Sequence, residues 1–383
     1  MRILTFLHSF ETGGVERIAL RLVRAWREGG VDAPLFIGHG DGDMRSDVGA
    51  GLAFDSPRRP PWLKVGSWET LWMILTLPRT VRRLRPDILF CAGNTYAIIA
   101  VALKLRLGRN CPPILAKVSN DLDRRDKPLW RRALYRLWLR TQGRFIDHFV
   151  GMETPMTDEI GERLVVARER IAIIPDPALS RALIDRLRTM PRIAPSMASG
   201  RQFVAVGRLA PQKNLSLMLR AFARGRREGD RLTLIGDGPE RPRLEALAEL
   251  LGIGRNVEFR GYVANPALLL PAFDILLLSS TYEGVPAVIL EALAARLPII
   301  ATDCSRSMPA LLRDGALGML IDVGDEIAFA DAIAGAKPGR QDAAASLAQA
   351  ERFTIERASD AYLATMAALG ADRAVCRNFV QAN

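Results

Sequence analysis

The chain has 383 residues, of which 49% are hydrophobic and 25% charged, and its formal net charge is +11. This length exceeds what one ordinary hydrophobic core supports, so two domains are expected, and the composition excludes a disordered chain. The four cysteines (Cys91, Cys111, Cys304 and Cys376) form no C-x-x-C pair, which argues against a disulfide framework or a zinc site and favours a cytoplasmic protein. The N-terminus lacks the pattern of a signal peptide, and no apolar run reaches the ~18 residues of a membrane-spanning helix.

The first half of the chain alternates strand-like and helical segments. A strand at residues 3–8 leads through Gly13 and Gly14 into an amphipathic helix over 15–28. Further strands are predicted at residues 33–37, 87–91, 114–118, 145–150 and 171–174. Because apolar runs separated by helix-length segments are typical of parallel sheets covered on both faces, residues 1–175 are predicted to form a doubly wound α/β domain.

The positive charge is concentrated in residues 1–175, which hold 28 Lys and Arg against 19 Asp and Glu, whereas the rest hold 25 against 23. This excess indicates an anionic partner, such as nucleic acid, anionic lipid or a phosphorylated substrate. Residues 61–85 and 129–145 interleave basic side chains with Trp and Leu: Trp62, Trp68 and Trp72 precede Arg79, Arg82, Arg83 and Arg85, while Arg131, Arg132, Arg136, Arg140 and Arg144 alternate with Trp130, Leu134, Leu137 and Trp138. The pattern fits a helix lying at an anionic membrane surface, and it fits equally a core helix with a solvated basic face.

The second half repeats the alternation more regularly. Strands are predicted at residues 203–206, 231–235, 257–260, 274–278 and 299–302, followed by an alanine-rich helical region and a last helix over 355–369. Pro175, Asp176 and Pro177 form the natural hinge, since X-Pro units interrupt helix and strand. We therefore predict a second doubly wound domain over 176–354 and a C-terminal helix over 355–383 that packs back on the first domain. Neither half carries a full G-x-G-x-x-G fingerprint, which argues against a nicotinamide enzyme.

Four consecutive strands of the second half end in loops that are suited to a ligand. After the first strand, Gly207 allows close approach of a ligand, and Arg208 and Lys213 supply two cations beside a helix N-terminus, as a diphosphate requires. Gly236 and Gly238 follow the second strand, and Gly261, Tyr262 and Val263 end the third. On their own, the two basic residues would be interpreted as a solvated loop, but the coincidence of four such loops predicts a binding site.

The fourth loop reads EGVPAVILE and places two carboxylates, Glu283 and Glu291, on either side of a Gly-Val-Pro turn. A helix is predicted to start near Pro286, because proline suits the first helical turn. Glu283 then lies in the loop at the carboxyl end of a strand, where open α/β sheets bind ligands. The alternative is that Glu283 is a solvated loop acid and Glu291 an ordinary helix glutamate.

In this order and spacing, VGRLAPQKN, LIGDGPE, FRGYV and EGVPAVILEAL resemble the donor-binding half of retaining GT-B glycosyltransferases of family 4, in their bacterial polysaccharide and lipopolysaccharide form. Gly13 and Gly14 resemble the N-terminal glycine loop of that family. The resemblance covers nearly the whole chain and is specific from Phe203 to Asp303. It implies two Rossmann-like domains that face each other across a cleft, with acceptor bound by 1–175 and nucleotide sugar by 176–354.

The resemblance also implies a role for each site residue. Arg208 and Lys213 would bind the donor diphosphate, Glu291 the ribose, and Glu283 the transferred sugar. Gly13 and Gly14 would close over the donor, and Gly261, Tyr262 and Val263 would lie near the base. Backbone amides from Pro286 to Val288, including Ala287, would add to phosphate binding at the helix N-terminus, and Gly284 and Val285 belong to the same donor-binding segment. Many relatives have a histidine after the strand where this chain has Ser119, Asn120 and Asp121, so Asn120 and Asp121 are acceptor candidates, and Asn94 is a third.

The implied reaction is a metal-independent transfer of a hexosyl or N-acetylhexosaminyl group from a nucleotide sugar, with UDP favoured over GDP, to a glycan or a lipid-diphosphate-linked glycan. No cofactor is expected. Fixed cations and backbone donors can stabilise a departing diphosphate without a metal. The resemblance further implies a cytoplasmic enzyme held peripherally on the inner face of the membrane.

Three alternatives belong to other classes. A sugar-nucleotide epimerase shares the two-domain fold but resembles these motifs poorly. A non-catalytic sugar-nucleotide-binding protein would bind donor and release no nucleotide. A nucleic-acid-binding protein would explain the basic charge, but the sequence has no recognised motif for it, so no nucleic-acid partner is expected.

Overall fold

The computed structural model describes residues 1–11, 13–46, 48–58, 68–119, 122, 128–190, 200–339 and 342–381, with the side chains of 129 and 372–381 left out. Within these ranges, no helix is both long and apolar enough to cross a membrane. The chain divides into two compact units: unit 1 comprises Met1–Pro177 and Ile355–Asn383, and unit 2 comprises Ala178–Thr354.

Unit 1 is built on a parallel sheet whose described strands have the order β2-β1-β3-β4-β5-β6. The bounds are β1 Ile3–Leu7, β2 Leu35–Ile37, β3 Ile88–Cys91, β4 Ile114–Lys117, β5 His148–Gly151 and β6 Ile171–Ile173. β1, β3 and β4 are buried along their whole length, as expected for strands covered on both faces. The sheet runs through the strands predicted for this half, each end shifting by a few residues at most.

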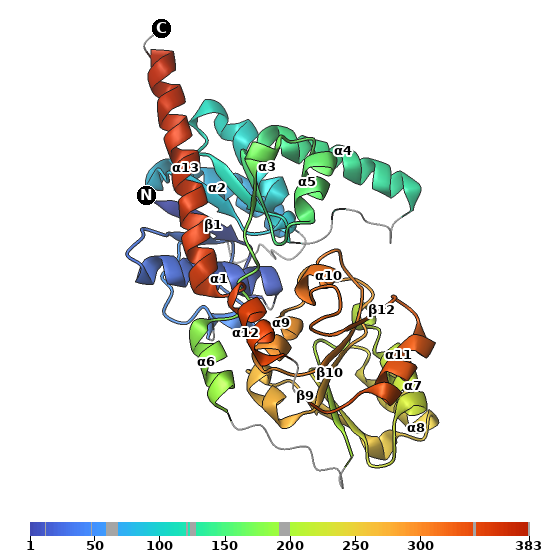
Figure 1. The fold of residues 1–383 in the computed structure, drawn as a ribbon. Coiled ribbons are helices and arrows are strands. Elements are labelled where there is room, and N and C mark those ends of the chain that lie inside the picture. Colours follow the sequence, from blue (N-terminus) through green and yellow to red (C-terminus); the bar gives the residue numbers. More distant parts are fainter. Residues whose placement is uncertain are drawn as a thin grey trace. The chain divides into compact units, whose positions relative to one another are not determined.

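Two groups of helices cover this sheet (Figure 1). α2 (Glu69–Leu84), α3 (Ala97–Leu107), α4 (Leu129–Phe145) and α5 (Met156–Leu164) pack in succession, while α1 (Gly14–Glu28) packs with α13 (Ile355–Gln381). Tyr362 of α13 is fully buried, and its ring centroid lies 6.2 Å from that of Trp26 and 5.3 Å from that of Phe90. The last helix therefore completes the core of unit 1.

Unit 2 contains a second parallel sheet, with the order β12-β11-β10-β7-β8-β9 in the described residues. The bounds are β7 Gln202–Val206, β8 Arg231–Ile235, β9 Val257–Gly261, β10 Ile275–Leu278, β11 Ile299–Thr302 and β12 Met319–Ile321. The first five coincide with predicted strands. β12 was not predicted; it is an edge strand whose first residue, Met319, is exposed, and its pairing with β11 defines it.

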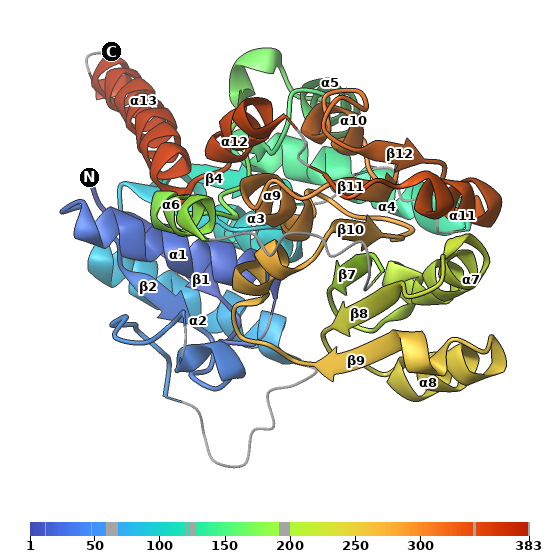
Figure 2. The same cartoon turned by 60° about the horizontal axis from the view of Figure 1, so that its bottom comes forward.

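Two apolar cores cover the opposite faces of this sheet (Figure 2). One core contains α6 (Arg181–Thr189), α9 (Ala287–Ala294), α10 (Met308–Leu311) and α12 (Ala343–Glu351); the other contains α7 (Leu215–Gly225), α8 (Arg241–Leu250) and α11 (Glu326–Gly335). Short 3₁₀ turns complete the connections: in unit 1 η1 Asp43–Arg45, η3 Asn94–Tyr96, η4 Gly108–Asn110 and η5 Arg168–Arg170, and in unit 2 η6 Pro211–Lys213, η7 Gly254–Asn256 and η8 Pro266–Ala272. Each unit is thus a doubly wound α/β domain.

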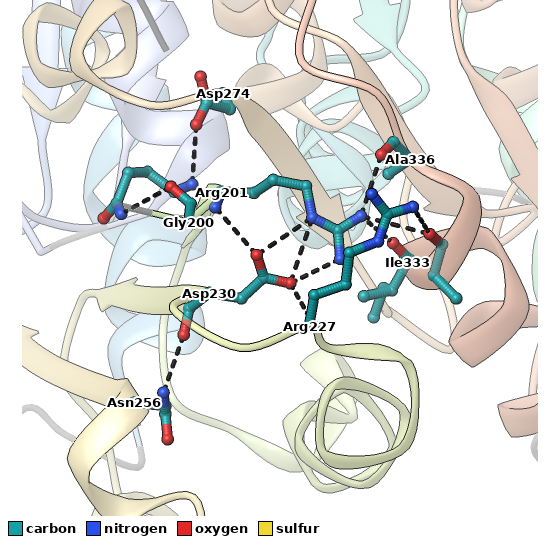
Figure 3. A network of polar contacts seen from close by, with 10 residues as sticks. Gly200, Arg201, Arg227, Asp230, Asn256, Asp274, Ile333 and Ala336 are labelled. Carbon is teal, nitrogen blue, oxygen red and sulfur yellow. Dashed lines mark hydrogen bonds and ion pairs between the residues drawn. The ribbon is translucent and has the colours of Figure 1, made fainter. Parts of the chain in front are cut away.

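A buried polar network fixes the amino-terminal end of the unit 2 sheet (Figure 3). The Arg201 guanidinium donates to both oxygens of Asp230, with Nη2–Oδ2 2.5 Å, and to the carbonyls of Ile333 and Ala336 at the end of α11. Side-chain exposure is 7% for Arg201 and 1% for Asp230. Because the charges are paired and hydrogen-bonded, this network joins β7, the turn before β8 and α11 without leaving a buried ion alone.

Both sheets contain a point where the strand order reverses direction. In unit 1 it lies between β1 and β3, and in unit 2 between β7 and β10. At such a switch point the two following loops diverge and leave a crevice at the carboxyl ends of the strands, which is where open α/β sheets bind ligands. The topology therefore predicts that the loops after β7 and β10 form a site.

Candidate donor-binding site

The side chains at the unit 2 switch point are Lys213, from the loop after β7, and Glu283, from the loop after β10. Lys213 Nζ lies 2.5 Å from Glu283 Oε1, and the two side chains are 21% and 12% exposed. Ser280 Oγ donates to the same carboxylate oxygen at 2.8 Å. Both described hydrogen bonds therefore use Oε1, which leaves Oε2 as an acceptor for a ligand hydroxyl.

Backbone contacts hold the loops after β7, β8 and β9 together. The Gly207 amide donates to the Ile235 carbonyl, the Leu209 amide to Asp237, and the Gly236 amide to Gly261, at 2.8–2.9 Å. Gly236 has φ +139°, and a Cβ there would lie 2.0 Å from the Gly207 carbonyl oxygen. No other residue fits so close a crossing. Three of the four predicted loops are therefore one connected structure.

The loop that carries Glu283 is fixed from β11 and from the β7 side. The Glu283 amide donates to the Cys304 carbonyl at 3.1 Å, and Ser305 Oγ donates to the Gly284 carbonyl at 2.8 Å. Gln212 Nε2 donates to the Tyr282 carbonyl at 2.8 Å. Burial, and then the nearby Glu283 carboxylate, raise the pKa of the Cys304 thiol to about 12, so this cysteine is not a thiolate nucleophile.

Arg208 is exposed, and within the described residues its guanidinium has no ion-pair or hydrogen-bond partner. It lies on the same loop as Lys213, five residues earlier in the sequence. α9 begins at Ala287, one residue after Pro286, which occupies the N-cap and provides no side-chain hydrogen bond. Proline has no N–H, so the predicted amide donors reduce to Ala287 and Val288 at the positive end of this helix.

The other predicted donor residues of unit 2 lie around this edge. Glu291 is partly buried in the second turn of α9. Gly261 ends β9 with φ +76°, Tyr262 is 69% exposed, and Val263 and Val285 pack against the core. The structure thus brings the loop residues of unit 2 to the carboxyl edge of one sheet. Their roles in binding remain predictions.

The predicted residues of unit 1 lie at that unit's own switch point. Gly13 is the N-cap of α1 after β1, and Gly14 is the first residue of that helix. Asn94 begins η3 after β3, and its Oδ1 accepts the Ser119 amide at 3.1 Å. Asn120 and Asp121 lie outside the described residues.

A cluster of histidines and carboxylates, which the sequence did not predict, occupies the same edge of unit 1. His39 Nε2, after β2, lies 2.8 Å from Glu69 Oε1. Tyr96 donates to Glu16 Oε1 at 2.6 Å, and its ring centroid is 4.8 Å from that of His8. Burial, with His39 as a second cause, lowers the pKa of His8 to about 4, so its imidazole is neutral at pH 7. No sequence pattern links these residues, because they follow three different strands.

The basic segments of unit 1 are partly exposed. On α4, Trp130, Leu134 and Leu137 are 60–63% exposed. The accompanying exposed arginines are Arg131, Arg136, Arg140 and Arg144, whereas Arg132 and Trp138 are partly buried. In the other segment, Trp68 is 62% exposed and Trp72 partly buried, and residues 61–67, including Trp62, lie outside the described ranges. A wholly buried-core interpretation is therefore wrong for Trp68 and Trp130.

Comparison with known families decides the class. Residues 200–336 match the family described as glycosyl transferases group 1, and residues 12–177 match glycosyltransferase family 4. The chain belongs to the family 4 glycosyltransferases. A lipopolysaccharide core biosynthesis glycosyltransferase of Rhizobium meliloti, LpsE, is 29% identical over 343 residues, which are 86% of this chain and 87% of the relative. The predicted class of enzyme is confirmed.

Solved structures give the same fold. The apo lipopolysaccharide outer core galactosyltransferase WaaB aligns with a TM-score of 0.75 at 19% identity, covering 96% of this chain and 99% of its own. Anabaena HepE in complex with UDP-glucose aligns with a TM-score of 0.74 at 17% identity, covering 96% and 100%. This family 4 glycosyltransferase therefore has the predicted GT-B fold.

Proposed function

We propose that this glycosyltransferase transfers a hexosyl or N-acetylhexosaminyl group from a UDP-sugar to a lipopolysaccharide or lipid-linked glycan, with retention of anomeric configuration and without a metal ion. The observation that carries the proposal is the Lys213–Glu283 pair at the switch point, with Arg208, which has no partner among the described residues, on the Lys213 loop. A cation pair for the diphosphate and a carboxylate oxygen for the sugar thus converge on one sheet edge. LpsE supports a lipopolysaccharide acceptor and HepE supports UDP.

In the proposed reaction, the bond between the anomeric carbon and the β-phosphate oxygen breaks, and its electron pair leaves with the nucleotide. The acceptor hydroxyl oxygen attacks from the face that the phosphate leaves, and its proton passes to the departing phosphate oxygen. Arg208 and Lys213 stabilise the charge on that phosphate, and the amides of Ala287 and Val288 add to it. Glu283 orients the sugar through Oε2 and forms no covalent bond.

The donor is tested by nucleotide release and thermal stability with UDP-glucose, UDP-galactose, UDP-N-acetylglucosamine and GDP-mannose. We expect a UDP-sugar far above its dissociation constant to stabilise the protein by about 2–4 kcal/mol, and turnover to survive chelation by EDTA. Arg208→Ala should lower turnover on the order of 10²-fold, whereas Arg224→Ala, an exposed arginine of the same unit, should not. Exclusive binding of GDP-mannose, or full turnover of Arg208→Ala, contradicts the donor proposal.

A lipid-linked acceptor would be reached at the inner membrane surface, and we propose that α4 binds that surface. Its exposed stripe of Trp130, Leu134 and Leu137 follows the spacing i, i+4, i+7, so the three side chains share one face. Each arginine beside this stripe contributes about 1 kcal/mol near an anionic leaflet. A helix of this kind lies in the interface rather than across it.

Vesicle co-sedimentation tests this surface. The wild type should sediment with phosphatidylglycerol vesicles at low salt and dissociate as salt rises, because the attraction is screened within a Debye length of ~10 Å at 0.1 M. Reversal of Arg136, Arg140 and Arg144 to Glu should abolish sedimentation. Equal sedimentation of the wild type with neutral vesicles, or no effect of the reversal, refutes the membrane surface.

A further inference from the structure

Helix α2 has three distinct faces, which follow from its 3.6-residue turn. Its core face carries the buried apolar residues Met73, Leu77 and Val81. Its exposed apolar stripe consists of Trp68, Leu71 and Leu75, which are 62%, 44% and 47% exposed. Between them runs a polar face with the spacing i, i+4, i+7, i+11: Trp72, Thr76, Arg79 and Arg83. This third face has no role in the core.

The polar face lines an open pocket together with Asp55, Pro57, Arg58 and Thr80. Three guanidinium groups therefore meet there, and Asp55 is the one carboxylate among the described lining residues. Asp55 Oδ2 accepts hydrogen bonds from Arg83 and Thr80 Oγ1. Arg58 and Arg79 are exposed, and the described residues give them no ion-pair partner. The pocket thus carries two uncompensated positive charges.

An indole side chain accompanies these charges. Trp72 lines the pocket, and its indole N–H is buried without a hydrogen-bond acceptor in the part of the chain that the structure describes. The indole therefore contributes a wall to the pocket, and the guanidinium groups provide its charge. An acceptor-rich group with about two negative charges would neutralise Arg58 and Arg79, and planar guanidinium matches phosphate oxygens in particular.

We propose that this pocket binds the phosphomonoester headgroup of a membrane lipid. The adjoining stripe of Trp68, Leu71 and Leu75 indicates the lipid as the source of the phosphate. One helix would insert its apolar stripe among the acyl chains while its next face holds the headgroup. The inference rests on the membrane association proposed above, but it adds a headgroup specificity that the charge of α4 alone cannot provide.

Co-sedimentation with three vesicle compositions separates the two proposals: phosphatidylcholine alone, and phosphatidylcholine mixed with phosphatidylglycerol or with phosphatidic acid at matched total charge. We expect tighter binding to phosphatidic acid than to phosphatidylglycerol, on the order of tenfold for two arginines. Arg58→Gln combined with Arg79→Gln should abolish this preference and retain binding to phosphatidylglycerol. A matched control, Arg224→Gln with Arg255→Gln in unit 2, removes the same charge and should retain the preference.

Each of the other outcomes refutes one of the two membrane proposals or both. Equal binding to the two charge-matched vesicles, or a preference that survives in the Arg58, Arg79 variant, refutes the headgroup pocket while leaving the α4 surface. Absence of binding to every vesicle refutes both. Soluble glycerol phosphate is the last arm: if it protects Arg79 from chemical modification as well as phosphatidic acid vesicles do, the pocket binds a free phosphate ester and the lipid is the wrong occupant.

Discussion

The contribution of the Lys213–Glu283 ion pair to stability can be predicted, because the exposed fraction of its side chains lies between that of surface ion pairs and that of buried ones. Exposed ion pairs contribute about 0.2–1 kcal/mol, whereas removing one partner of a buried pair costs about 3–5 kcal/mol. With 2.5 Å between the charged atoms and side chains 21% and 12% exposed, we expect Lys213→Met to destabilise the β7 and β10 edges by about 1–3 kcal/mol. Glu283→Gln should relieve part of this cost, giving a coupling energy of about 1–2 kcal/mol in a double-mutant cycle.

Hydrogen exchange of the β7 and β10 amides measures this loss of stability at the two strands themselves. A local measurement is needed because a chain with two units need not unfold in a single step. All six tryptophans precede residue 139, so tryptophan fluorescence reports on unit 1 and serves as the internal control. A second control is the more exposed Arg220–Glu326 pair of the same unit, for which we expect coupling below about 0.5 kcal/mol. Additivity of the Lys213 and Glu283 variants within about 0.3 kcal/mol would refute the reasoning.

Three further results are expected. Glu291→Gln should mainly raise the donor KM, and Glu283→Gln should mainly lower kcat, because a ribose contact is made equally in ground and transition states; steady-state kinetics with the reverse pattern contradicts these roles. Burial alone would raise the pKa of Asp230, but hydrogen bonds from Arg201 and Arg227 outweigh it and lower the pKa below its ordinary 3.8. The stability that Asp230 contributes is therefore complete above pH 3.8 and is lost as the pH falls through the lower pKa of the folded state. Asp230→Asn should reduce the fall in melting temperature at acid pH, and an unchanged fall contradicts this expectation. Arg201→Ala leaves Asp230 buried without its cation and should lower the free energy of unfolding by about 3–5 kcal/mol, measured by hydrogen exchange of the β8 amides. A loss under about 1 kcal/mol contradicts this expectation.

Most strands could be predicted from the sequence because each is a mainly apolar run between helix-length segments. β10 is four consecutive apolar residues and is buried on both faces. The loops at the strand ends were predictable for the same reason, since glycines and charges follow each run directly. β12 was missed because this edge strand is only partly buried, and its pairing with β11 specifies it.

Side-chain partners could not be predicted, because they join distant parts of the chain. Lys213 and Glu283 are 70 residues apart, and their contact depends on the reversal of strand order between β7 and β10. The His39–Glu69 pair likewise joins the loop after β2 to the start of α2, and the Tyr96–Glu16 hydrogen bond joins the turn after β3 to α1. A carboxylate or histidine in a loop has no sequence pattern that names its partner, so the sequence predicted which loops matter and left their hydrogen bonds unspecified.

The division of unit 1 into two distant stretches has a consequence for biosynthesis. Synthesis proceeds from the N-terminus, so every strand of unit 2 is made before α13, which supplies Tyr362 to the aromatic contact with Trp26 and Phe90. Unit 2 can therefore finish folding first, although more than half of unit 1 precedes it. Until α13 emerges, the nascent chain displays an apolar surface around Trp26, and that interval is when this protein is most exposed to chaperones and to aggregation.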